Sequence, residues 1–112
     1  MFQKLRPLEN EELVLRDQGL FQQMVSWKPG YLHLTTRRLI FAQGEKVTFQ
    51  RYLEDLEKVD IVKRKCILSK MVKQLQIVSG GRVNYIAIRK VDNWLSEIYQ
   101  TFFELDLDGI ER

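Results

Sequence analysis

The clearest structural signal in this chain is the stretch Gly30-Tyr31-Leu32-His33-Leu34-Thr35-Thr36-Arg37-Arg38-Leu39-Ile40-Phe41-Ala42. In its first half, Leu32 and Leu34 alternate with more polar residues, which is the period of a half-buried strand. Its second half, residues 39–42, is a continuous apolar run and indicates a more deeply buried strand. The polar residues 36–38 between the halves predict that the two strands fold back on each other as a hairpin.

Turn-forming residues divide the rest of the chain into further short strands. Turns on the two sides of the hairpin are predicted by Lys28-Pro29-Gly30 and by residues 43–46, and a later hairpin turn by Ser79-Gly80-Gly81-Arg82. The two leucines of segment 53–56 predict a short helical turn that points both of them inward. The remaining apolar or alternating segments predict strands at about 20–27, 31–35, 39–42, 47–52, 58–62, 72–78 and 83–88.

The period of the apolar residues changes at Asp92, which is placed to cap a helix N-terminus. Beyond it, apolar residues recur every three or four positions, the pattern of an amphipathic helix over roughly residues 92–105. Trp94 lies on the apolar face and is expected in the core. Strands joined by short turns are antiparallel, so we expect a bent antiparallel barrel whose open end is covered by this helix.

The order of these elements and the central hairpin resemble a known family. Seven strands and a C-terminal helix match the pleckstrin-homology superfold. The stretch 30–41 resembles the signature of its GRAM branch: a glycine, an "LxLT" strand, a polar pair and "RLIF". Segment 53–56 stands where that family has an "L-x-D-I" turn, and Trp94 matches the early tryptophan of its closing helix. The resemblance covers about residues 11–105 and implies a bent seven-stranded barrel of two near-orthogonal sheets, capped by one helix.

Length and composition indicate one domain spanning residues 1–112, with a core over about 11–105. No apolar run approaches the ~20 residues that cross a bilayer, and we see no secretory signal at the start. Cys66 is the only cysteine, which excludes an internal disulfide and a cysteine-based metal cluster. We therefore expect a cytoplasmic protein whose association with membranes is peripheral.

Neither a catalytic nor a metal site is indicated by the pattern of reactive residues. His33 is the only histidine and has no cysteine or acidic cluster at ligand spacing, so no metal and no cofactor are expected. The Ser79-Gly80-Gly81 turn precedes a predicted strand rather than a helix, unlike a phosphate-binding loop. We expect a protein that is not an enzyme, as the resemblance to GRAM domains also implies.

The net charge of +3 is distributed unevenly, with acidic residues near both ends and basic residues in the middle. In segment 63–73 five cations flank Cys66, Ile67, Leu68 and Met71. One interpretation is that the apolar side chains enter a membrane interface while the cations meet anionic headgroups. The other is that these apolar residues continue the strands into the core and the lysines form a solvated face.

The resemblance implies a membrane-associating, phosphoinositide-binding or protein-docking module. Our leading hypothesis is an anionic-lipid adaptor, and the alternative is a protein-interaction module without lipid specificity. Nucleic acid is not an expected partner, because aromatic residues are not interleaved with the basic run. For Arg38 we favour a structural role, paired with Asp55 or Glu54. Trp27 is either an interfacial anchor or packed under the turn. The expected anion-binding residues are Lys28, Arg37, Lys63, Arg64, Lys65, Lys70 and Lys73, and the expected membrane contacts are Trp27, Ile67, Leu68 and Met71.

Overall fold

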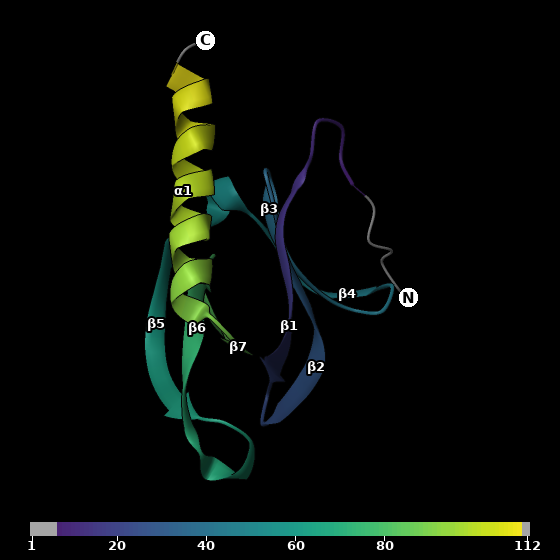
Figure 1. Cartoon of the computed structure of the whole chain (residues 1–112), viewed down its shortest axis with the longest axis vertical. Helices are drawn as coiled ribbons and strands as arrows, with labels where there is room; N and C mark the ends of the chain where they lie inside the picture. Colours follow the sequence, from purple (N-terminus) through teal and green to yellow (C-terminus); the bar gives the residue numbers. More distant parts are fainter. Residues whose placement is uncertain (1–6, 111–112) are drawn as a thin grey trace.

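The computed structural model describes the backbone of residues 7–110 and the side chains of residues 7–105 (Figure 1). It contains seven strands, two short 3-10 helices (η1 and η2) and one long helix. The elements in chain order are β1 (Leu13–Gln23), β2 (Ser26–Thr35), β3 (Arg38–Gln43), β4 (Lys46–Tyr52), η1 (Leu53–Asp55), β5 (Lys58–Lys65), η2 (Ile67–Ser69), β6 (Met71–Ser79), β7 (Arg82–Ile88) and α1 (Val91–Ile110).

The strands form one antiparallel sheet in the order β4-β3-β2-β1-β7-β6-β5. The predicted mainly-β fold, with seven antiparallel strands and a C-terminal helix, is therefore confirmed. The sheet bends strongly (Figure 1), but its edge strands β4 and β5 do not pair with each other in this order. The term barrel thus applies only loosely, and the strands form one continuous bent sheet rather than two.

The central hairpin forms as predicted and supplies much of the core. Leu32 and Leu34 of β2 pack with Leu39 and Phe41 of β3, and all four side chains are completely buried. Ile40, which points to the other face of β3, is also buried, so the continuous apolar run corresponds to a strand covered on both faces.

The predicted turn at Lys28-Pro29-Gly30 is wrong, because these residues lie inside β2. The chain reverses earlier, at Met24 and Val25, between the paired residues Gln23 and Ser26. Pro29 is tolerated because β3 pairs with β2 only from Tyr31 onward, so the missing N–H of Pro29 interrupts no bond to β3. The first strand correspondingly begins at Leu13 and ends before the position expected from the apolar pattern.

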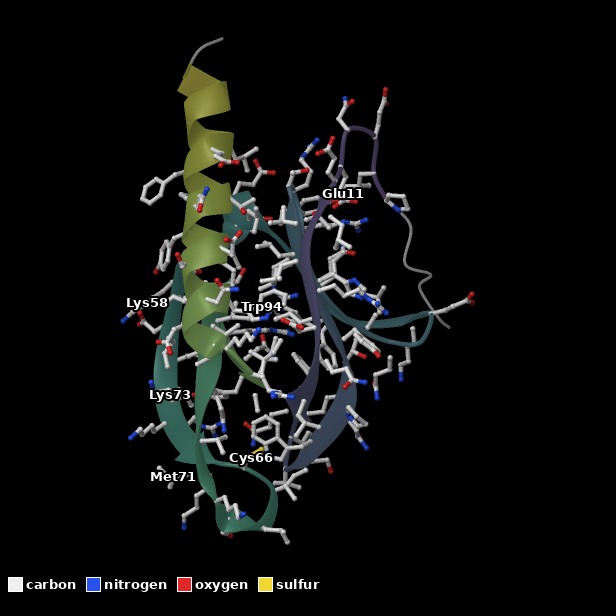
Figure 2. All side chains as sticks on the ribbon, viewed as in Figure 1. Glu11, Lys58, Cys66, Met71, Lys73 and Trp94 are labelled. Atoms are coloured by element: carbon white, nitrogen blue, oxygen red, sulfur yellow. The ribbon has the colours of Figure 1, made fainter. Side chains whose placement is uncertain are left out.

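The C-terminal helix closes the core from one side of the bent sheet, next to β5 and β6 (Figure 1). Trp94 and Ile98 are buried, as expected for its apolar face. The Trp94 Nε1–H donates a hydrogen bond to Asp17 Oδ2 of β1 at 2.9 Å, which joins α1 to the other half of the sheet. Figure 2 shows Trp94 between α1 and β1. The helix extends to Ile110, beyond the predicted end. In the predicted helical turn η1, Leu53 is fully buried and Leu56 is half-buried.

Candidate surface for anionic membranes

The basic segment 63–73 is a single hairpin tip, formed by the end of β5, the loop 66–70 and the start of β6. Its apolar side chains point into solvent: the exposed fraction is 51% for Ile67, 86% for Leu68 and 59% for Met71. Of the two interpretations of this segment, the one in which these side chains continue the strands into the core is therefore wrong. We refer to residues 63–73 as the basic tip.

Backbone geometry explains why Leu68 is displayed so fully. It has φ 60° and ψ 28°, the left-handed region that a leucine rarely adopts and that glycine or asparagine prefers. The loop holds this conformation through backbone hydrogen bonds, in which Cys66 N–H donates to Lys70 O and Ser69 N–H donates to Cys66 O. Leu68 is therefore exposed and also has a backbone conformation that disfavours leucine. No contact among the described residues gives it a stabilising role.

Four lysines surround these apolar side chains, and all four are exposed. Lys63 and Lys73 stand directly opposite each other in the β5–β6 register. Like charges at such positions repel and destabilise the strand pair. Figure 2 shows Lys73 and Met71 projecting away from the sheet, and Lys73 Nζ lies 3.7 Å from the exposed carboxylate of Asp92. The remaining lysines of the group are Lys65 and Lys70.

Arg64, expected among the anion-binding residues, is held by other parts of the protein. Its guanidinium lies 3.5 Å from the centre of the Tyr85 ring, a cation–π contact. Its Nη1 donates to Gln22 Oε1 at 2.8 Å and to Gln74 Oε1 at 3.1 Å. Arg64 therefore links the basic tip to β1, and it is not displayed with the lysines.

A second apolar tip lies at the same end of the molecule and was missed from the sequence. Met24 and Val25, at the β1–β2 turn, are 94% and 93% exposed. Figure 1 places this turn at the same end of the molecule as the basic tip, and the hydrogen bond from Arg64 to Gln22 links the two hairpins near their tips. The apolar pattern assigned these residues to a strand, although the polar Gln22-Gln23 pair before them and Ser26 after them were a signal of a turn.

Two further expected residues lie near this second tip. Lys28 is exposed, and Trp27 is half-buried opposite Gln22 in the β1–β2 register. Trp27 is therefore neither fully displayed as an anchor nor packed beneath a turn, because the expected turn does not exist.

The two arginines of the central hairpin lie at the other end of β2. Arg37 is half-buried in the β2–β3 turn, where its carbonyl accepts a hydrogen bond from Leu53 N–H. The ten residues of β2 separate it from the β1–β2 turn. Arg38 has the expected structural role, but its ion-pair partner is Glu11 rather than Asp55 or Glu54.

The Glu11–Arg38 pair is buried and densely hydrogen-bonded. Arg38 Nε lies 2.7 Å from Glu11 Oε2, and the Thr35 hydroxyl donates to the same oxygen at 2.6 Å. Burial alone would raise the pKa of Glu11. The bonds from Arg38, Thr35 and the Leu8 N–H, with the charge of Arg38, outweigh burial and lower that pKa from 4.5 to about 2.

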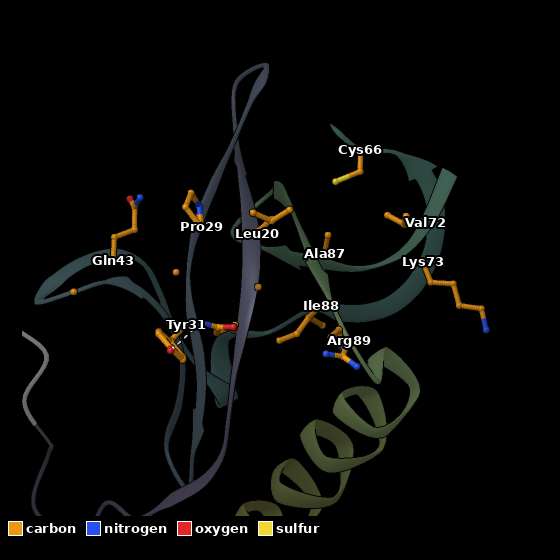
Figure 3. Close-up of a pocket in the computed structure, with 14 residues that line it drawn as sticks. Leu20, Pro29, Tyr31, Gln43, Cys66, Val72, Lys73, Ala87, Ile88 and Arg89 are labelled. Carbon is orange, nitrogen blue, oxygen red and sulfur yellow. Dashed lines mark hydrogen bonds between the residues drawn. The ribbon is translucent and has the colours of Figure 1, made fainter. Parts of the chain in front are cut away.

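A cleft of about 730 Å³ lies between the two halves of the sheet, close to both tips (Figure 3). Leu20 and Pro29 line one side, and Val72 and Ile88 line the other. The Cys66 side chain points into the cleft from the loop of the basic tip (Figure 3). Lys73 and Arg89 also border the cleft, although the Lys73 side chain points away from it (Figure 3).

The charge distribution favours an anionic partner for this end of the molecule. The sequence has no aspartate or glutamate from Gln18 to Gly44, or from Ile61 to Val91. These ranges contain both tips and the whole β6–β7 hairpin. The Asp92 carboxylate beside Lys73 lies just outside these ranges, and it offsets only part of their positive charge. A surface with excess positive charge attracts anions over roughly a Debye length.

Metal and membrane-spanning features are not found in the part of the chain that the structure describes. Within residues 7–105, no group of three or more His, Cys, Asp or Glu side chains is arranged to hold a metal ion. His33 is buried, and both its burial and the nearby charge of Arg16 lower its pKa. Over the same described region, no helix has the length and apolarity needed to span a bilayer.

Comparisons with known proteins add information on the fold. No family model and no curated protein sequence matches this chain. Among solved structures, the chain is similar to the crystal structure of the C-terminal domain of an unknown protein from Leishmania infantum. The two are 13% identical, with a TM-score of 0.68 over 85% of this chain and 87% of that one. Likeness at this identity concerns the fold alone.

Proposed function

We propose that this chain is a non-enzymatic, GRAM-type binding module that associates peripherally with anionic membrane surfaces through its basic tip. The observation that carries the proposal is the joint exposure of Ile67, Leu68 and Met71 among exposed lysines. Anionic lipids give the cytoplasmic leaflet its negative surface potential, so the location that we propose is cytoplasmic and peripheral to the membrane. The seven strands and closing helix support the resemblance of the central hairpin to GRAM domains.

The expected strength of this association is that of a reversible contact. A lysine near an anionic leaflet contributes about 1 kcal/mol, and full burial of a leucine or methionine side chain contributes roughly 1.5–3 kcal/mol. Several such contributions, reduced by the cost of orienting the protein, correspond to weak to moderate affinity. Because the lysines lie at the surface, salt weakens their part of the binding.

Vesicle sedimentation tests the proposal. The protein should sediment with vesicles that contain phosphatidylserine, more at higher phosphatidylserine content and less at higher salt. The Lys65→Glu/Lys70→Glu variant should lose most of this binding. Lys58→Glu/Arg82→Glu is the matched control, because it reverses the same number of exposed charges at the far end of β5 and β7. Failure of the unmodified protein to sediment at low salt would overturn the proposal.

A protein partner is the second candidate function, and a different surface favours it. β5 is an edge strand of the sheet, so part of its backbone is open to a further strand. At Val59 the backbone carbonyl already accepts a hydrogen bond from the Tyr99 hydroxyl of α1. Tyr99 and Phe103 on the neighbouring helix α1 are 40% and 60% exposed. A partner that binds there should be recovered in pull-downs with the Lys65→Glu/Lys70→Glu variant as well as with the unmodified protein. Loss of recovery with Phe103→Ser would identify that surface.

A further inference from the structure

We propose that the Met24–Val25 turn enters the same anionic bilayer as the basic tip, so that the protein binds by two tips in a fixed orientation. This inference rests on the proposed function and extends it to a surface that the sequence pattern assigned to a strand. Met24 and Val25 are the most exposed large apolar side chains among residues 7–105.

The two tips share an unusual local structure. Met24 has φ 55° and Leu68 has φ 60°, so each tip presents an apolar residue in the left-handed region. Asparagine or glycine is the ordinary choice at such positions. In each tip the side chain is also almost fully exposed, at 94% for Met24 and 86% for Leu68. Local backbone preference and solvation both disfavour these residues, which indicates a role in contact with an apolar phase.

Arg64 holds the two hairpins beside each other. It pairs with Val72 near the base of the basic tip, and its partner Gln22 pairs with Trp27 near the base of the β1–β2 turn. The 2.8 Å bond from Arg64 Nη1 to Gln22 Oε1 thus joins the bases of the two tips. Its stacking on Tyr85 and its bond to the buried Gln74 fix the guanidinium plane. Arg64 is in this sense a positioning residue.

The charges around both tips identify the bilayer as anionic. Lys28 follows the β1–β2 turn, and lysines flank the basic tip on both strands. The two segments that carry the tips contain no carboxylate between Gln18 and Gly44 or between Ile61 and Val91. An anionic bilayer has charged headgroups above an apolar interior. The lysines of this surface can contact the headgroups while the two apolar tips enter the interior.

Depth-dependent fluorescence quenching tests this arrangement on the full chain. In a Cys66→Ser background, a single cysteine is placed at Val25→Cys, at Leu68→Cys or at Glu54→Cys and labelled with an environment-sensitive dye. Glu54 is the control position, because η1 lies beside the β2–β3 turn, at the opposite end of β2 from Met24. Vesicles contain phosphatidylserine and brominated acyl chains. We expect quenching at positions 25 and 68, and none at position 54.

The outcomes separate this inference from the proposed function. Quenching at position 68 without quenching at position 25 overturns the two-tip arrangement and leaves the proposed function intact. Absence of quenching at both positions overturns both. A second measurement uses Met24→Asn and Leu68→Asn, which suit the left-handed backbone and should keep the fold. Each should weaken vesicle binding by about tenfold, and unchanged binding of Met24→Asn would contradict the inference.

Arg64→Lys tests whether Arg64 holds the two hairpins beside each other, and it preserves the positive charge. Lysine lacks the planar guanidinium that bonds to both Gln22 and Gln74 in the unmodified protein. The two tips should therefore lose their common orientation. Quenching at position 25 should fall relative to position 68 in this variant, while binding at low salt persists. An unchanged ratio of quenching at the two positions would show that Arg64 does not set their orientation.

Discussion

Glu11 and Arg38 form a buried ion pair across 27 residues of sequence, with Arg38 Nε 2.7 Å from Glu11 Oε2. The pair joins the segment before β1 to the start of β3. The same segment is held by Thr36, whose N–H donates to Glu12 O and whose hydroxyl accepts from Glu12 N–H. The polar residues of the central hairpin therefore hold the N-terminal part of the described chain against the sheet through hydrogen bonds and an ion pair.

Removing one partner of this pair should destabilise the protein strongly. Glu11→Ala leaves the Arg38 guanidinium buried with the loss of its carboxylate partner, which should cost about 4 kcal/mol. Urea unfolding followed by circular dichroism measures the change. Glu12→Ala is the control, because the Glu12 side chain is exposed and only its backbone makes these bonds. Similar stability of the two variants would contradict a structural role for the pair.

The pair should also make stability depend on pH in the acid range. Because the pKa of Glu11 falls from 4.5 to about 2 on folding, the folded state favours the carboxylate. Its contribution, on the order of 3 kcal/mol, is full above about pH 4.5 and is lost as the pH falls towards 2. Glu11→Gln should remove this part of the pH dependence. Unfolding free energies at several pH values between roughly 2 and 6 provide the check.

Asp17 should stabilise the fold through the indole of Trp94. Asp17→Ala leaves the buried Trp94 N–H without its acceptor, which costs about 1–3 kcal/mol. Asp17→Asn keeps a carbonyl oxygen as acceptor and should cost clearly less. Thermal unfolding and the near-ultraviolet signal of the tryptophans distinguish the two variants. Equal destabilisation would show that the charge of Asp17, rather than its hydrogen bond, is what matters.

Gly30 should not tolerate even a methyl group. A Cβ at this position would lie 2.6 Å from Ala42 O and 2.7 Å from the Phe41 ring. Backbone and a packed ring cannot both yield, so Gly30→Ala should cost about 1–3 kcal/mol, as overpacking in a core does. Ser26→Ala, on the exposed part of the same strand, is the control and should be within about 0.5 kcal/mol of the unmodified protein. Equal stability of the two variants would contradict this close packing.

Leu68→Asn should separate stability from membrane binding. Asparagine suits the φ of 60° at this position, so the unfolding free energy should be unchanged or slightly higher. Loss of the 86% exposed leucine should lower the fraction of protein that sediments with anionic vesicles. A marked loss of stability would indicate that Leu68 packs within the protein instead of facing a membrane.

Much of the fold could be predicted because the decisive patterns are local. The alternation of Leu32 and Leu34 and the apolar run 39–42 report burial on a strand, and each needs only neighbouring residues to be recognised. The same is true of the helix that carries Trp94. The first turn was predicted at the wrong place, because Pro29 is a typical turn residue. That Pro29 can lie inside β2 becomes clear only from where the pairing of β2 with β3 ends.

The candidate surface was only partly predictable. The basic tip could be located because cations lie on both sides of a group of apolar residues within one short segment. Whether Ile67, Leu68 and Met71 were core or surface depended on where the sheet ends, and periodicity could not decide it. The sequence pattern does not predict the second tip at Met24 and Val25, because a two-residue turn without glycine resembles a continuing apolar strand.

Local patterns in the sequence are enough to predict the hairpin at residues 30–42, the closing helix and the concentration of positive charge, because periodicity and composition act over short distances. Three features are visible only in the folded protein: the partner of Arg38, the contacts of Arg64 with Gln22 and Tyr85, and the placement of two apolar tips at one end. Each of these depends on residues brought together by the bend and register of the sheet, across 27 positions for Arg38 and 42 for Arg64. That long-range pairing determines which charged and apolar side chains remain exposed at the surface.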